Sequence, residues 1–364
     1  MQFHSLKISK IVSETEDTNT FYFDIPIALK DQYQFKPGQH LTLKTMINGQ
    51  EVRRAYSICT APSDNIIGVT VKKVKNGLMS SFLHSNINEG DTMDVMTPEG
   101  HFVLQPDDAK SRDLYFIAAG SGITPVMSMI RSVLEDEPKS IAHLLYGSRD
   151  ENNIIFKSDL DTLMQKYEGQ LVVKYVLSQP VEKKSGGIAG MFSKKVVEWK
   201  GPKGRINKEV CKKFFTENEP RNEEKHYFIC GPGDFIQNTE ALLLDRHIDK
   251  KSIHKEYFTP ASAPENTSEK QLNTAVVSVT LKGKTFDLEI PKGKTILDMM
   301  VDAKKDPPYS CTSGACSTCI AKVIEGEVVM DSCYALDDDE VAAGYILTCQ
   351  SHPTTTKVVL TYDV

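Results

Sequence analysis

The sequence lacks any uninterrupted apolar run that approaches the roughly 20 residues needed to span a bilayer. Its first twenty residues also lack the continuous apolar core of a signal peptide. The formal net charge is −6, so the chain has no positive excess with which to attract nucleic acid. These absences predict a cytoplasmic, soluble protein that neither inserts into a membrane nor binds nucleic acid.

Two familiar motifs are present only in incomplete form. Gly283-Lys284-Thr285 and Gly293-Lys294-Thr295 end like a P-loop, but Ser278 and Leu288 stand where the motif needs its first glycine. None of the nine histidines forms an HxxxH pair. The chain therefore shows no recognisable site of its own for activating oxygen or an organic substrate.

The length of 364 residues predicts two or three domains, at about 150 residues per domain. Residues 1–107 contain short strands separated by turns, which predicts an antiparallel β-barrel. Strands then alternate with helical segments through 108–258, which predicts an α/β fold with a parallel sheet. Residues 259–273 are rich in Pro, Ser, Thr and Asn and read as a linker to a small α+β domain at 274–364.

The individual segments are predicted as follows. Strands are expected at 20–25, 41–45, 55–59, 67–72, 93–96, 114–119, 141–146, 171–177, 227–230, 276–282, 285–290 and 357–362. Helices are expected at 125–134, 160–167, 235–246 and 296–303. The basic, glycine-containing segment 181–203 is expected to form a surface insertion.

Negative charge and cysteine are concentrated at the end of the chain. Residues 275–364 hold 8 lysines, no arginine and 13 acidic residues, so −5 of the total −6 lies there. Five of the eight cysteines also fall in this part. In a cytosolic protein, such a cluster more often binds metal than forms disulfides.

The cysteine spacing indicates an iron–sulfur cluster. Cys311-x4-Cys316-x2-Cys319, followed by Cys349, is the plant-type 2Fe-2S pattern, and small residues lie between the first three. Small side chains let backbone N–H groups approach the sulfurs. A thioredoxin-like pair at Cys316 and Cys319 does not open a helix after a strand, and a four-cysteine zinc site usually has two close pairs. Inert buried cysteines are the remaining alternative.

The last ninety residues resemble a plant-type ferredoxin with a β-grasp fold. The stretch 336–349, LDDDEVAAGYILTC, is typical of that family before its fourth ligand. The resemblance assigns the cluster to Cys311, Cys316, Cys319 and Cys349. Cys333 matches no ligand position and is expected to be an ordinary thiol.

Three short segments of the first domain resemble the flavin site of the ferredoxin–NADP reductase superfamily. They are Arg54-Ala55-Tyr56-Ser57, then Val71-Lys72, then Gly77-Leu78-Met79-Ser80. An aromatic ring can lie against a flavin, and a guanidinium pairs with phosphate. The resemblance implies bound FAD rather than FMN, because Glu256-Tyr257-Phe258 supplies an aromatic end to the second domain. The residues expected at this site are Arg54, Tyr56, Ser57, Val71, Lys72, Gly77, Met79, Ser80 and Phe258.

The second domain begins with a strand and the turn Gly120-Ser121-Gly122-Ile123-Thr124-Pro125. A helix that starts after such a turn directs its first N–H groups and its dipole toward an anion. Gly120, Gly122, Thr124 and Pro125 are expected to bind the dinucleotide, with Pro125 at the first helical position after an N-capping Thr124. The turn resembles the one that the reductase superfamily uses for nicotinamide dinucleotides.

Two later segments bear on the nicotinamide cofactor. Ser148 and Arg149 follow a strand and suit a 2′-phosphate, which favours NADPH over NADH, although Asp150 is adjacent and weakens this choice. The superfamily resemblance places Cys230-Gly231-Pro232 beside the nicotinamide ring. Cys230, Tyr56 and Phe258 are therefore expected to border the reacting rings.

The order of the three domains resembles reductase components of multicomponent oxygenases. This resemblance implies that electrons pass from NADPH through FAD and the 2Fe-2S cluster to an external acceptor, an oxygenase component such as phenylacetyl-CoA epoxidase. Two alternatives are a general NAD(P)H reductase that serves a desaturase or another acceptor, and a redox-sensing iron–sulfur regulator. The sequence does not indicate an oligomeric state.

Overall fold

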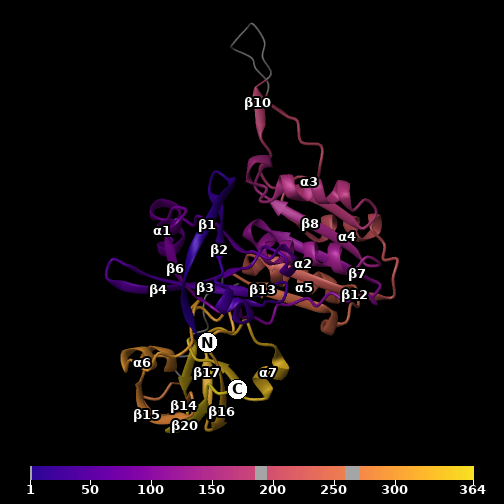
Figure 1. Ribbon diagram of the computed structural model, residues 1–364. Helices are drawn as coiled ribbons and strands as arrows, with labels where there is room; N and C mark the ends of the chain where they lie inside the picture. Colours follow the sequence, from indigo (N-terminus) through magenta and orange to yellow (C-terminus); the bar gives the residue numbers. More distant parts are fainter. Residues whose placement is uncertain (1, 185–194, 259–270) are drawn as a thin grey trace.

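The computed structural model describes residues 2–184, 195–258 and 271–364. These residues form three regions, each built around its own sheet (Figure 1). Most of the predicted linker 259–273 and the middle of the predicted insertion 181–203 lie outside the described residues. The described parts of the insertion, β10 (Glu182–Lys184) and β11 (Lys195–Val197), pair as an antiparallel ribbon that points away from the rest of the molecule.

The first region is the antiparallel β-barrel expected from its closely spaced strands. Its six strands run in the order β4-β3-β6-β1-β2-β5, and a bridge between Ile58 and Val69 joins the two ends of the sheet. Alternate residues such as Leu41 and Leu43 are fully buried inside it. The strands are β1 (Phe3–Thr15), β2 (Thr18–Asp24), β3 (His40–Ile47), β4 (Gln50–Ser57), β5 (Ile67–Lys72) and β6 (Thr92–Met96), with helix α1 (Leu78–Asn86) and the 3-10 segments η1 (Ile27–Tyr33) and η2 (Pro62–Asp64).

The second region has a parallel sheet in the order β13-β12-β7-β8-β9. Phe116 on β7 packs with α2 and α3 on one face, whereas Tyr115 packs with α4 and α5 on the other. Both faces are therefore buried, as a parallel sheet requires. The elements are β7 (Arg112–Ala119), η3 (Gly120–Gly122), α2 (Ile123–Asp136), β8 (Ile141–Ser148), η4 (Glu151–Asn153), α3 (Lys157–Lys166), β9 (Leu171–Leu177), α4 (Lys208–Glu217), β12 (Glu224–Gly231), α5 (Gly233–Asp245), η5 (Lys250–Ser252) and β13 (Ile253–Tyr257).

The third region, residues 271–364, is the C-terminal domain, and it has the expected α+β form. Its sheet runs in the order β15-β14-β20-β16-β18, with β14 and β20 parallel and the other pairs antiparallel. Ile296 and Met300 of α6 are fully buried against this sheet. The elements are β14 (Thr274–Leu281), β15 (Lys284–Pro291), α6 (Ile296–Asp302), β16 (Ile320–Glu325), β17 (Val328–Met330), α7 (Asp338–Ala342), β18 (Tyr345–Leu347), β19 (Ser351–Pro353) and β20 (Lys357–Thr361).

Several elements were absent from the sequence prediction. The longest is β1, in which polar residues outnumber buried ones, so it has no continuous apolar run to reveal it. No helix was expected at Gly77 to Ser80, but Gly77 is the N-cap of α1 and Leu78 to Ser80 form its first residues. The strand expected at 55–59 is the end of β4, which begins at Gln50.

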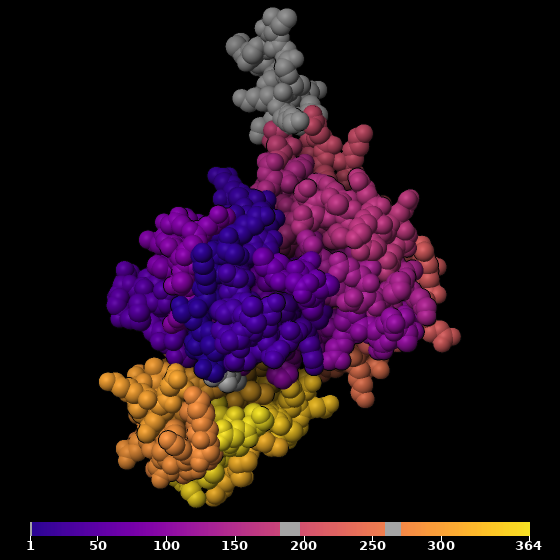
Figure 2. Space-filling model, viewed as in Figure 1, coloured from indigo at the N-terminus to yellow at the C-terminus, as the bar shows by residue number. Residues whose placement is uncertain are grey.

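The C-terminal domain packs against the barrel and against the lower edge of the parallel-sheet region, as Figures 1 and 2 both show. None of the helices in the described ranges is long and apolar enough to cross a bilayer.

Candidate functional site

The end of β4 presents the first group of predicted site residues. Arg54 and Tyr56 are partly exposed on this strand, and Ser57 is buried at its end. Helix α1 packs against β3 and β4, so its N-terminus lies on the same part of the barrel. These positions fit a ligand that has both an aromatic ring system and phosphates, because a guanidinium and a helix N-terminus each attract phosphate.

The turn before α1 is closely packed. Ser80 Oγ accepts a hydrogen bond from the backbone N–H of Val74 at 3.2 Å. A Cβ atom at Gly77 would lie 2.5 Å from the same oxygen, so a larger residue would displace the turn. The side chains of Met79 and Ser80 are buried, which leaves the backbone N–H groups at the start of α1 as the groups suited to an anion.

Val71 and Lys72 lie on β5, but their side chains already have other partners. The Val71 side chain is fully buried in the barrel core, so only its backbone could contact a cofactor. Lys72 Nζ lies 3.4 Å from an Asp17 carboxylate oxygen. Their part in flavin binding stays a prediction.

Three residues from different parts of the chain meet where the barrel faces the parallel sheet. Ser57 Oγ donates a hydrogen bond to Glu256 Oε2 at 3.2 Å, and Cys230 Sγ lies 3.9 Å from the same oxygen. Cys230 ends β12, and Glu256 lies beside it on the parallel neighbour β13. Burial raises the pKa of Glu256 to about 8 and holds the pKa of the Cys230 thiol well above its usual value. Both groups are therefore mainly protonated at neutral pH.

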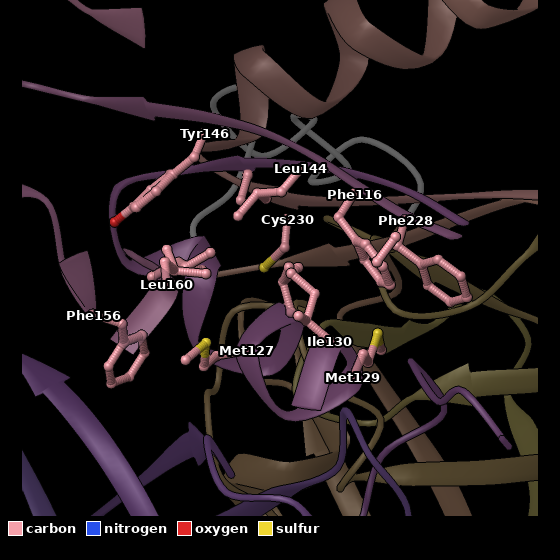
Figure 3. Packing of buried hydrophobic residues seen from close by; sticks show 14 of the residues in the cluster. Phe116, Met127, Met129, Ile130, Leu144, Tyr146, Phe156, Leu160, Phe228 and Cys230 are labelled. Carbon is pink, nitrogen blue, oxygen red and sulfur yellow. The ribbon is translucent and has the colours of Figure 1, made fainter. Parts of the chain in front are cut away.

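Glu256 is the functional candidate that sequence reasoning missed. In the sequence it is only the first residue of Glu256-Tyr257-Phe258, and its pairing with Ser57 depends on the tertiary structure. Phe258 follows β13 directly and remains 37% exposed, so its ring is available to cover a neighbouring ligand. Figure 3 shows the other surroundings of Cys230, which packs with Phe116 and Ile130 against α2.

The glycine turn after β7 lies against the end of β12. A Cβ atom at Gly122 would lie 2.1 Å from the carbonyl oxygen of Cys230, so only glycine fits there. A Cβ atom at Gly231 would lie 2.8 Å from the Phe235 ring. Gly120 has φ +58° and open space at its Cβ position. The turn thus places a bare backbone and a helix N-terminus next to Cys230, an arrangement that fits a dinucleotide phosphate.

The start of α2 differs from the sequence prediction. Gly120 to Gly122 form a 3-10 turn that continues into a helix beginning at Ile123, so Thr124 is not its N-cap and Pro125 is the third helical residue. Thr124 Oγ1 donates to the carbonyl oxygen of Ser121 at 3.0 Å. The prediction failed because a 3-10 turn joined to the helix moves its first residue toward the N-terminus. Pro232, by contrast, is the N-cap of α5.

The segment after β8 contains the residues expected to select the cofactor. Ser148 Oγ donates to the carbonyl oxygen of Asn153 at 2.8 Å, so its proton is already used. The Arg149 side chain is 58% exposed and lies 3.1 Å from Asp150 Oδ2. Asp150 also accepts hydrogen bonds from the Asn152 backbone and the Asn153 side chain. The guanidinium is thus the accessible group of this segment, while the carboxylate is tied to the turn that follows.

The four predicted cluster ligands come together around one loop. Cys311 Sγ accepts hydrogen bonds from the backbone N–H groups of Ser313 at 3.4 Å and Cys316 at 3.3 Å. Hydrogen bonds with the thiols of Cys316 and Cys349 also hold the pKa of Cys311 well below its usual value. The backbone N–H of Thr348 donates to the carbonyl oxygen of Cys319 at 3.2 Å, which brings Cys349 to this loop.

This set of thiols fits a two-iron cluster, in which each iron takes two protein thiolates. Among the described residues, no three His, Cys, Asp or Glu side chains are grouped as a single metal ion would need. The N–H donors on Cys311 are the groups that tune a cluster potential. Cys319 and Cys349 are buried, so water has little access to that side of the site.

Cys333 lies on a neighbouring loop outside the ligand set. The backbone N–H groups of Tyr334 and Ala335 both donate to the carbonyl oxygen of Gly314 in the ligand loop. Gly314 has φ +71°, and a Cβ atom there would lie 2.7 Å from the Ser332 carbonyl oxygen. Burial raises the pKa of Cys333 to about 11, which keeps it as a neutral thiol.

The loop that carries Cys311, Cys316 and Cys319, here called the cysteine loop or ligand loop, faces the other two regions. Thr318, between two of the ligands, lies 3.4 Å from His40 of β3, measured between Oγ1 and Nε2. The rings of Tyr334 and Tyr257 are 5.0 Å apart between centroids. Tyr257 stands between Glu256 and Phe258 in the chain, so the cysteine loop is close to the site at Ser57 and Glu256.

Comparison with known families assigns each region. Residues 5–104 match the oxidoreductase FAD-binding domain, residues 116–241 the oxidoreductase NAD-binding domain, and residues 279–354 the 2Fe-2S iron–sulfur cluster binding domain.

Known relatives match this chain over almost its whole length. The chain is 35% identical to a subunit of 1,2-phenylacetyl-CoA epoxidase from Escherichia coli, over 99% of this chain and 98% of the relative. It is 33% identical to the ferredoxin reductase component of 3-ketosteroid-9-alpha-monooxygenase from Rhodococcus rhodochrous, over 96% and 94%. Among solved structures, phthalate dioxygenase reductase matches with a TM-score of 0.58 and 25% identity, over 99% of this chain and 98% of that one. The chain therefore belongs to the family of FAD- and NAD-binding oxidoreductases that carry a C-terminal 2Fe-2S ferredoxin domain and act as electron-transfer components of oxygenase systems.

Proposed function

We propose that this reductase takes electrons from NADPH and passes them through FAD and the 2Fe-2S cluster to an oxygenase component, with phenylacetyl-CoA epoxidase as the first candidate. The observation that carries this proposal is the meeting of Ser57, Cys230 and Glu256 beside the cysteine loop. The relative from Escherichia coli is a subunit of that epoxidase, which supports this choice of acceptor.

Flavin supplies the conversion between a two-electron donor and a one-electron cluster. Around it, the protein has to position the rings and exclude water. Arg54 and the N-terminus of α1 would hold phosphate, and Tyr56 and Phe258 would lie against the flavin ring. Gly122 and Gly231 let the turn after β7 lie directly against the end of β12, because a Cβ atom at either position would meet neighbouring protein atoms.

Glu256 holds a proton, and Ser57 fixes the orientation of the Glu256 carboxyl group. Ser57 Oγ donates to Glu256, which fixes the carboxyl beside Cys230. Below pH 8 the carboxyl retains its proton, so the nicotinamide side of the site is neutral. Cys230 then occupies the space next to the reacting ring without introducing a charge.

The proposed preference for NADPH over NADH depends on Arg149. Its guanidinium is accessible, and it forms the planar fork that suits a phosphate group. The carboxylate of Asp150 is engaged by three hydrogen bonds within its own turn, which lowers its capacity to accept ribose hydroxyls.

We also propose the domain division 1–107, 108–258 and 274–364, joined by the linker 259–273. The three family matches fall inside these limits, which supports the division. None of the eight cysteines forms a disulfide, which supports a cytoplasmic location.

The acceptor is expected to present a basic surface. Helix α7 starts with four acidic residues from Asp337 to Glu340, and the adjacent Leu336 packs with Cys319 and Cys349. Negative charge is therefore placed next to the cluster ligands. A basic partner would be guided to this helix by long-range attraction.

The test is reconstitution with purified components. NADPH, the holoenzyme and the oxygenase component of phenylacetyl-CoA epoxidase should support epoxidation, with cytochrome c reduction as the measure of general electron transfer. Fast cytochrome c reduction without epoxidation, but with turnover of a desaturase, would favour a general reductase. Slow reduction of every acceptor, together with a partner whose binding changes on cluster loss, would favour a sensor and contradict the proposal.

A further inference from the structure

Arg53 lies beside Arg54 on β4 but has a different environment. Successive side chains of a strand point to opposite faces, so the two arginines serve different sides of the barrel wall. Arg54 is partly exposed and belongs to the expected flavin site. The Arg53 side chain is only 7% exposed, and the residues around it come from both the barrel and the C-terminal domain.

The guanidinium of Arg53 joins the two domains through charge and through ring contacts. It lies 2.8 Å from a Glu51 carboxylate oxygen in the barrel and 3.1 Å from Asp306 Oδ1 in the C-terminal domain. Its central carbon lies 5.1 Å from the ring centroid of Phe3 and 4.3 Å from that of Tyr309. One aromatic ring thus comes from each domain. We call this set of five residues the Arg53 clasp.

The arrangement suits arginine and not lysine. Arginine combines a fork of N–H donors with a flat cation that stacks on aromatic rings, and it carries less tightly bound water than an ammonium group. Tyr309 adds a hydroxyl that lies 3.5 Å from the same Glu51 oxygen. The clasp is therefore a specific contact rather than a general attraction of opposite charges.

We propose that Arg53 is a positioning residue for electron transfer from flavin to cluster, because its clasp holds the C-terminal domain against the barrel with the cysteine loop toward the flavin site. This inference rests on the proposed function. Each transfer removes one electron from the reduced flavin and adds it to the oxidised cluster, and NADPH supplies the electrons in pairs. The rate depends on the fraction of molecules in which the domains are docked.

A second contact shows what the clasp positions. His40 of β3 lies against Thr318, which stands between Cys316 and Cys319. His40 is buried, and β3 pairs directly with β4, the strand that carries Arg53. The clasp and the contact at the ligand loop are therefore anchored on neighbouring strands, so loss of the clasp would move the loop relative to the barrel.

A second ion pair between the domains offers an internal comparison. Lys250 lies 2.5 Å from Asp338, but their side chains are 58% and 88% exposed. Exposed pairs contribute little, because water and salt screen them. The docked position should therefore depend on Arg53 and scarcely on Lys250.

The experiment compares matched variants of the holoenzyme by anaerobic stopped flow. Arg53→Ala should slow cluster reduction by flavin roughly tenfold or more, because it removes a buried guanidinium that contacts both domains, and Asp306→Asn should slow it less, because the Asp306 side chain is 72% exposed. Asp306 has φ +50°, a conformation that asparagine also accepts, so Asp306→Asn removes charge without backbone strain. Arg53→Lys should be slow as well, and it guards against failure of the alanine variant to fold.

Lys250→Ala should transfer electrons within about twofold of the wild-type rate. Flavin reduction by NADPH and the cluster potential should be unchanged in every variant. Small-angle X-ray scattering supplies a readout that is independent of activity, and Arg53→Ala should show a larger radius of gyration than Lys250→Ala.

Two results would overturn the inference. One is cluster reduction at the wild-type rate in both Arg53→Ala and Asp306→Asn. The other is an equal slowing in Lys250→Ala, which would show that any lost charge pair has this effect. Failure of the proposed function looks different, because the wild-type flavin itself would then not be reduced by NADPH.

Discussion

Glu256 Oε2 accepts a hydrogen bond from Ser57 Oγ at 3.2 Å, although the two residues are 199 positions apart in the chain. This bond connects the end of β4 in the barrel with β13 in the parallel sheet. It places a protonated carboxyl where the barrel faces the parallel sheet.

The rate of flavin reduction by NADPH should rise with pH through about 8. The buried carboxyl of Glu256 ionises there, and a carboxylate stabilises the positive charge that hydride loss leaves on nicotinamide. Glu256→Gln should remove this rise and lower the high-pH rate roughly 10- to 100-fold. Stopped-flow measurements from pH 6 to 9 test this, and an unchanged profile in the variant would contradict it.

Stability should change in the opposite direction with pH. Because folding raises the pKa of Glu256 from 4.5 to about 8, the folded state holds a proton that the unfolded chain has lost. The contribution to stability is complete below about pH 4.5 and is lost as pH rises through 8. As pH rises from 4.5 to 8, the melting temperature of the wild type should thus fall more steeply than that of Glu256→Gln.

Cys230→Ala should lower kcat for NADPH oxidation roughly tenfold and change KM much less, because the thiol positions the reacting ring and does not bind the phosphates. It should also cost about 1–3 kcal/mol of stability through loss of buried volume. Cys211→Ala is the matched control, since Cys211 is equally buried but lies on α4. A similar loss of kcat in both variants would reduce the role of Cys230 to packing.

Cys349→Ser should abolish the bound cluster, whereas Cys333→Ser should retain the iron and acid-labile sulfide of the wild type. The two cysteines differ in position. Cys349 is hydrogen-bonded to Cys311 among the predicted ligands, whereas Cys333 is a neutral thiol on the neighbouring loop that covers Gly314. Metal analysis after anaerobic purification measures both. Loss of iron from Cys333→Ser would make Cys333 a fifth cysteine needed for the cluster.

Arg149→Ala should raise KM for NADPH roughly tenfold and leave KM for NADH unchanged. The exposed guanidinium suits the additional phosphate of NADPH, which NADH lacks, and a lost charge-assisted contact has about this effect. NADH serves as the control within the same variant. A wild-type enzyme that uses both cofactors equally would refute the assignment.

Much of the architecture could be predicted from local patterns. The barrel, the alternating strands and helices, and the C-terminal domain follow from turn spacing and hydrophobic periodicity, which depend on neighbours in the chain. The ligand cysteines were predicted the same way, because three of them share one loop. Strand β1 was not found, since only its pairing with β2 and β6 identifies it.

Local contacts within irregular turns could not be predicted either. Ser148 carries a hydroxyl in the expected place, but its proton is bonded to Asn153. The N-cap expected at Thr124 was wrong, because a 3-10 turn precedes the helix.

The sequence by itself determined which cofactors this protein is built to hold, because each motif is a short run whose spacing matches one chemistry. Only the tertiary structure decided how the three sites meet. Glu256 reaches Ser57, and Arg53 reaches Asp306, across hundreds of residues. Such pairs have no signature in the chain, since their residues become neighbours only when separate sheets pack together.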